Sequence, residues 1–170
     1  MILGPDGKPL TRTAALARKS GIPRRAIERA GTTLGERDSL DRLARTVVML
    51  AAGASLLREG SRESWRGRCQ HCGKEAALSW CHVISRATWG TRWDVDNAFA
   101  ACSGCHRTLD QHWQQKEAWI SGRLGEARWR MLLLRAHAGR KPDLAGVRLH
   151  LLAEGAKLLG VERWNGEIPT

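Results

Sequence analysis

Two Cys-x-x-Cys pairs limit what this chain can fold into more than any other feature of its sequence. The pairs are Cys69–Cys72 and Cys102–Cys105, and residues 73–101 separate them. Each pair presents two thiolates from one tight turn, so two pairs together complete a tetrahedral four-sulfur zinc site. The spacing therefore predicts a structural Zn²⁺ in a reducing compartment, not disulfide bonds. The fifth cysteine, Cys81, has no such partner.

The sequence around these pairs predicts two short strands followed by a helix. Residues 76–84 and 98–101 have strand character, and a helix is expected from residue 103 to residue 119 or 120. More helices are expected before residue 60 and over residues 126–138 and 143–159. We therefore predict an α+β fold, mostly helical, with a central zinc-stabilised hairpin-helix module and helices on both sides. The expected regions are residues 1–60, 61–121 and 122–170.

Three further residues give this central module a recognisable pattern. His82 lies near the end of the first predicted strand, Asn97 in the hairpin loop, and His106 on the helix directly behind the second cysteine pair. This order, together with the cysteine pairs, resembles the HNH (ββα-metal, or His-Me finger) endonuclease motif over residues 69–120. The resemblance implies a ββα-metal module at the centre of the chain.

Within that group the chain looks closest to the phage NinG/Rap recombination endonucleases. The similarity is carried by residues 81–86, by residues 92–97 and by the second cysteine pair. It implies metal-dependent phosphodiester hydrolysis in branched DNA, such as Holliday junctions and D-loops, leaving 5′-phosphate and 3′-hydroxyl ends. Two alternatives are an HNH nuclease acting on linear duplex DNA, of packaging, restriction or homing type, and a catalytically dead zinc-ribbon DNA-binding protein.

The resemblance also implies roles for individual residues. His82 would be the general base, Asn97 would orient it, and His106 would be both a catalytic residue and a metal ligand on the helix. Asp110 follows His106 by one helical turn, so both side chains share a face and suit a catalytic Mg²⁺, Mn²⁺ or Zn²⁺. Cys81 departs from the pattern, because many HNH motifs have an acidic residue or histidine there and a thiol is a poor ligand for Mg²⁺.

The charge balance predicts a nucleic-acid partner. The chain has 28 Lys and Arg residues against 17 Asp and Glu residues, a formal net charge of +11 at pH 7. The candidate DNA contacts are Arg86, Arg92, Trp93 and Arg107, which surround the predicted site in sequence. The alternative for the tryptophans of this loop is that they cover a small core.

The first 60 residues contain two weaker signals. Residues 16–30 are similar to a helix-turn-helix, in which Arg24, Arg25 and Arg29 would face DNA; the alternative is a basic structural hairpin. Residues 39–59 predict one helix, because apolar residues from Leu40 to Leu57 recur at spacings of three and four. This apolar stripe packs either on its own domain or on a second copy, as a homodimer.

No part of the sequence predicts contact with a membrane. Residues 1–8 lack the apolar core of a secretion signal, and the most apolar stretch, residues 47–54, is too short to span a bilayer. We therefore expect the protein in the cytoplasm of a phage-infected or prophage-carrying bacterium.

Overall fold

The structure, a computed structural model, describes residues 24–60 and 62–168, and for residues 24–34 only the backbone. The chain divides into two units, Met1–Leu40 and Asp41–Thr170. Everything discussed below as a site lies in the second unit. The predicted helix-turn-helix of residues 16–30 falls mainly outside the described residues, and only residues 24–30 are seen, as the start of helix α2 (Arg24–Ala51).

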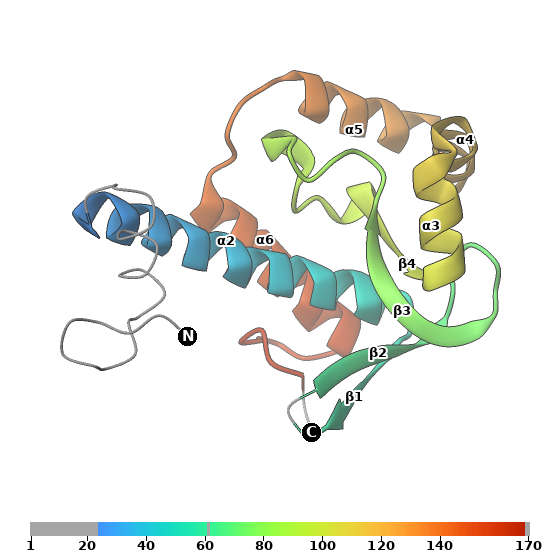
Figure 1. The fold of residues 1–170 in the computed structure, drawn as a ribbon, viewed down its shortest axis with the longest axis horizontal. Helices are drawn as coiled ribbons and strands as arrows, with labels where there is room; N and C mark the ends of the chain where they lie inside the picture. The colour runs from blue at the N-terminus through green and yellow to red at the C-terminus, as the bar shows by residue number, and fades with distance from the viewer. Residues whose placement is uncertain (1–23, 61, 169–170) are drawn as a thin grey trace. The chain divides into compact units, whose positions relative to one another are not determined.

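Four antiparallel strands form a single sheet in the order β1-β2-β3-β4 (Figure 1). The strands are β1 (Ser55–Glu59), β2 (Arg62–Arg68), β3 (Glu75–His82) and β4 (Ala98–Cys102). The register pairs Leu78 with Cys102 and His82 with Ala98. All of β4 except Cys102 is buried, because its small side chains and Phe99 lie beneath the covering helices. The two strands predicted around residues 76–84 and 98–101 are therefore confirmed.

Helices follow the sheet in sequence, and the first three of them share a hydrophobic core with it. The helices are α3 (Ser103–Gln111), α4 (Trp113–Leu124), α5 (Glu126–His137) and α6 (Leu144–Leu159), and two short 3₁₀ turns, η1 (Trp89–Thr91) and η2 (Val95–Asn97), interrupt the β3–β4 loop. Helix α3 packs on β3 and β4, and α5 packs on α4 and on both 3₁₀ turns (Figure 1). The α+β prediction is thus confirmed. The helix expected from residue 103 to residue 120 is two helices, separated at His112.

Helix α2 ends earlier than its apolar repeat predicts. The repeat runs to Leu57, but the helix ends at Ala51, and Gly53 follows with a φ of 66°. Glycine adopts this left-handed conformation without steric cost and so ends helices readily. The chain then turns into β1, where Leu56 pairs with Trp65 of β2. The helix predicted over residues 39–59 is therefore confirmed as far as residue 51, and its continuation to residue 59 was wrong.

The core lies between the sheet and the helices that cover it. Phe99, Leu109 and Leu132 are almost fully buried in it, and the ring of Phe99 lies 4.6 Å from that of Trp119, centroid to centroid. Leu43 and Val47 of α2 are buried within a single copy of the chain. Dimerisation through this helix is thus not supported. No helix among the described residues is long and apolar enough to cross a membrane.

Candidate metal sites and the cleft beside them

The four paired cysteines come together at one corner of the sheet. Cys69 and Cys72 lie in the turn after β2, which Gly73 closes with a φ of 74°, while Cys102 and Cys105 lie where β4 runs into α3. The four sulfur atoms are all within 4.8 Å of one another, and the Sγ atoms of Cys72 and Cys102 are 3.9 Å apart. Zn–S bonds of about 2.3 Å in a tetrahedron place sulfurs roughly 3.8 Å apart. The predicted grouping of cysteines is thus present and could hold a metal ion.

Hydrogen bonds prepare this cluster to bind a cation. Burial alone would raise the pKa of the Cys69 thiol, but backbone amides of Cys102, Cys72 and His71 donate to its sulfur and lower the pKa to about 7. The pKa of Cys105 is raised by burial and by the three neighbouring sulfurs. A bound metal would therefore replace protons on this cluster, since only thiolates are good ligands.

A second group of ligand-type side chains lies between β3 and α3. Cys81, His106 and Asp110 have ligand atoms within 4.8 Å of one another. His106 Nε2 is 3.2 Å from Asp110 Oδ2, so the two residues expected to share a helix face do so. Cys81, whose thiol is a poor ligand for Mg²⁺, joins this pair from the strand. We call these three residues the mixed cluster.

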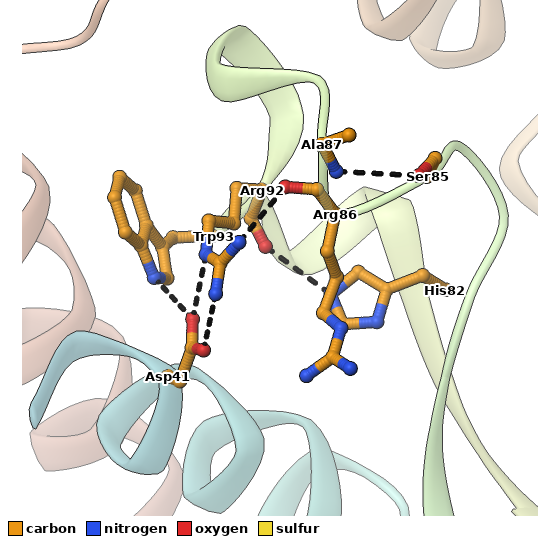
Figure 2. A network of polar contacts seen from close by, with 7 residues as sticks. All are labelled: Asp41, His82, Ser85, Arg86, Ala87, Arg92 and Trp93. Carbon is orange, nitrogen blue, oxygen red and sulfur yellow. Dashed lines mark hydrogen bonds and ion pairs between the residues drawn. The ribbon is translucent and has the colours of Figure 1, made fainter. Parts of the chain in front are cut away.

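His82 points away from the mixed cluster's thiol because consecutive strand residues face opposite sides of a sheet. Its Nε2 donates to the Arg92 carbonyl at 3.2 Å, which leaves Nδ1 as the hydrogen-bond acceptor (Figure 2). Burial, helped by the nearby Arg86 and Arg92 guanidiniums, lowers the pKa of His82 to about 4. The imidazole is therefore neutral at neutral pH.

Asn97 fixes the loop that follows His82. Its fully buried side chain accepts from the Ile84 amide at 2.7 Å and donates to the carbonyls of Ile84 at 3.0 Å and Thr91 at 2.9 Å. Among the described residues it makes no hydrogen bond to His82, which Asn97 was expected to orient. Its contacts instead tie together the two ends of the loop on which the His82 ring rests.

Two of the four candidate DNA contacts are held by an acidic residue far away in sequence. Asp41 of α2 accepts from Arg92 Nε at 3.0 Å and Nη2 at 2.6 Å, and from the indole of Trp93 at 2.7 Å (Figure 2). Trp93 is buried. The other two candidates, Arg86 and Arg107, are exposed. Asp41 could not be paired with this loop from sequence spacing.

A cleft of about 920 Å³ opens beside these residues. His82, His106 and Asp110 all line it, although they come from different elements. Its cationic residues are Arg45, Arg86 and Lys116, and its aromatic residues are Trp65, Trp80 and Trp113. The cleft thus combines positive charge with flat aromatic rings, a composition that suits nucleic acid. Arg45 and Lys116 were not among the residues singled out from sequence.

The comparisons with known proteins gave one finding. A family model described as the phage terminase large subunit gpA, ATPase domain, matches residues 16–129. The matched range includes the four cysteines, the mixed cluster and the whole sheet. Neither the curated proteins nor the solved structures compared with the chain gave a significant match. The phosphate-binding pattern G-x-x-x-x-G-K-[ST] does not occur in the sequence, so we assign no nucleotide-binding residues.

This match corrects the family and the activity expected from sequence. Identification as an HNH endonuclease of the NinG/Rap type was wrong, and so was cleavage of Holliday junctions or D-loops. The physical reason is that cysteine pairs and a His/Asn/His order report a local hairpin and helix, and one local fold can carry many functions. The coarser expectations are confirmed: a phage protein, a family of enzymes and DNA as the partner.

Proposed function

Because the chain belongs to the family of the phage terminase large subunit gpA ATPase domain, we propose that it contacts DNA during phage genome packaging through a metal-stabilised module. The module consists of the sheet, α3 and the four-cysteine cluster. Packaging of a phage genome takes place in the infected cell, so the host cytoplasm is where this contact would occur.

The four-cysteine cluster supplies the stability of this module. Its sulfurs are spaced for tetrahedral zinc, and they connect the β2–β3 turn to the start of α3. The first pair is already anchored to β4 through Gln70. The backbone N–H of Gln70 donates to the Ala100 carbonyl at 3.0 Å, and its side-chain Oε1 accepts from the Ala100 backbone N–H at 2.9 Å. Zinc bound here would stabilise the folded state, since an unfolded chain offers no preformed site.

The cleft supplies the surface for DNA. The observation that carries this proposal is the pair of exposed guanidiniums on its rim, Arg45 on α2 and Arg86 after β3. Neither has an acidic partner among the described residues, whereas Arg92 is neutralised by Asp41. A free, exposed arginine can bind a phosphate in two-pronged fashion. Trp113, 47% exposed, offers an indole ring at the same cleft.

Arg107 extends the proposed surface beyond the cleft, because it is exposed on α3 beside His106. Contacts of this kind go mainly to the DNA backbone and carry little sequence information. The proposal is therefore binding of duplex DNA with little dependence on sequence, which suits a protein that must handle a whole genome.

Titration of a labelled duplex, followed by fluorescence anisotropy at several salt concentrations, tests this proposal. We expect Arg45→Ala and Arg86→Ala each to weaken binding about five- to tenfold and to reduce the salt slope by about one, as loss of one phosphate contact does. Arg163→Ala is the matched control, because Arg163 is exposed but does not line the cleft. A double cleft variant that binds like the control would place the DNA surface elsewhere.

A further inference from the structure

The mixed cluster of Cys81, His106 and Asp110 brings three possible metal ligands together. His106 Nδ1 lies 2.9 Å from Ser79 Oγ, and the Ser79 hydroxyl donates its hydrogen to the Ala101 carbonyl at 3.1 Å. A hydroxyl has one hydrogen to give, so Ser79 can only accept from His106. Nδ1 therefore carries a proton, and Nε2 is the ring nitrogen that remains for another partner.

Nε2 lies 3.2 Å from Asp110 Oδ2, and the buried thiol of Cys81 completes the group. The three ligand atoms lie within 4.8 Å of one another. With metal–ligand bonds of about 2.1 Å, an N···O distance of this size corresponds to a ligand angle of about 100°, which is close to a tetrahedral angle. The spacing is thus that of two ligands of one metal ion.

Lys116 brings positive charge to the same place. It comes from α4, is 4% exposed, and its Nζ lies 2.5 Å from Asp110 Oδ1. Burial raises the pKa of the Cys81 thiol to about 12, and the charge of Lys116 opposes this rise. A lysine is rarely this buried unless it is paired, and here its ammonium is placed against the carboxylate and the thiol.

We propose that Cys81, His106 and Asp110 form a second divalent-metal site and that the Lys116 ammonium occupies its cation position and competes with the metal. A thiol, an imidazole and one carboxylate favour a thiophilic ion such as Zn²⁺ over Mg²⁺. Metal would therefore enter only as Lys116 moves away from Asp110. The inference does not depend on DNA binding, and its failure would leave the cleft proposal untouched.

Cobalt titration of the full chain, with zinc already bound at the four paired cysteines, tests this competition. Co²⁺ bound to a thiolate gives visible absorption bands, so each bound ion can be counted. We expect weak uptake of one further Co²⁺ by the wild type, and uptake at least about tenfold tighter by Lys116→Met. Lys116→Arg, which keeps the charge, should stay at or below the wild-type affinity. Cys81→Ala in the Lys116→Met background should lose the sulfur-dependent band.

Controls for folding keep the result interpretable. Each variant should retain one zinc at the four paired cysteines and an unchanged circular dichroism spectrum, and Lys116→Gln provides a second neutral variant if Lys116→Met does not fold. In the wild type, His106→Ala should abolish the weak uptake. Equal affinity in the wild type and both neutral variants would overturn the competition, and absence of a further Co²⁺ in all of them would overturn the site.

Discussion

The four-cysteine cluster and the mixed cluster both take ligand-type residues from α3 and from the sheet or its turns, yet their electrostatic surroundings are opposite. The first gathers four thiols whose polar neighbours are backbone amides, so its negative charge has to be met from outside the chain. The second combines three different ligands with a buried ammonium from Lys116. A group of ligand-type side chains is therefore not by itself a metal site, because a neighbouring charge such as the Lys116 ammonium can take the place of the metal.

The largest expected effect is loss of metal from the four-cysteine cluster. Cys102→Ser should abolish zinc binding and cooperative unfolding of residues 41–170. Serine still caps α3, since Cys102 is the N-cap residue and its sulfur accepts from the Cys105 amide at 3.5 Å, so loss of the cap does not explain the effect. Zinc content by elemental analysis and thermal unfolding by circular dichroism measure the outcome.

Cys81→Ala is the control for that experiment. Cys81 is fully buried whereas Cys102 is partly buried, and Cys81 belongs to the mixed cluster. We expect it to keep one zinc per chain and to lose only about 1–2 kcal/mol of stability, the cost of a small cavity. If both variants lost zinc alike, the separation of the two clusters would fail.

Sequence alone could predict those parts of the molecule whose geometry is local. A Cys-x-x-Cys pair and an i,i+4 pair such as His106 and Asp110 bring side chains together whatever the rest of the chain does. Strands β3 and β4 were likewise predictable from composition. Gly53 shows the limit: a helical repeat continues past it in sequence, but one left-handed residue ends α2 and sends Leu56 into a strand.

Contacts that depend on how elements pack were beyond the sequence. Lys116 contacts Asp110 because α3 ends before His112 and a separate helix, α4, begins after it. Asp41 holds Arg92 and Trp93 across about 50 residues of sequence. Family and activity were missed for a related reason, since the cysteine and histidine spacing reports a local fold that different functions share.

A second prediction concerns the wall of the cleft. Hydrogen bonds hold this wall, whereas we propose that a metal holds the corner with the four paired cysteines. Asn97→Ala removes three hydrogen bonds of a fully buried amide and leaves the Ile84 and Thr91 groups unsatisfied. We expect a loss of about 2–4 kcal/mol in the free energy of unfolding, with zinc content unchanged. Urea unfolding measures it.

Asn165→Ala is the matched control for Asn97. Its side chain accepts one exposed hydrogen bond from the Glu167 amide, so the loss should be within about 0.5 kcal/mol. A zinc content that fell in Asn97→Ala would mean that the loop and the cysteine corner are a single unit, and the contrast drawn between them would be wrong.

The smallest expected effect concerns Asp41, which holds the Arg92–Trp93 end of the same loop. Asp41→Asn keeps the size of the side chain but removes its charge. In the ion pair, the side chain of Arg92 is 14% exposed and that of Asp41 is 17% exposed. A two-pronged, largely desolvated pair should be worth about 1–2 kcal/mol, more than a surface pair. A double-mutant cycle with Arg92→Met isolates that coupling, because each single variant also leaves a charge or a polar group behind.

If coupling is present, Arg92 stabilises the fold through Asp41. Releasing it in Asp41→Asn should then add positive charge beside Arg86 and tighten duplex binding slightly. Coupling near zero, with DNA affinity lost in Arg92→Met, would instead return Arg92 to the DNA surface where the sequence analysis placed it.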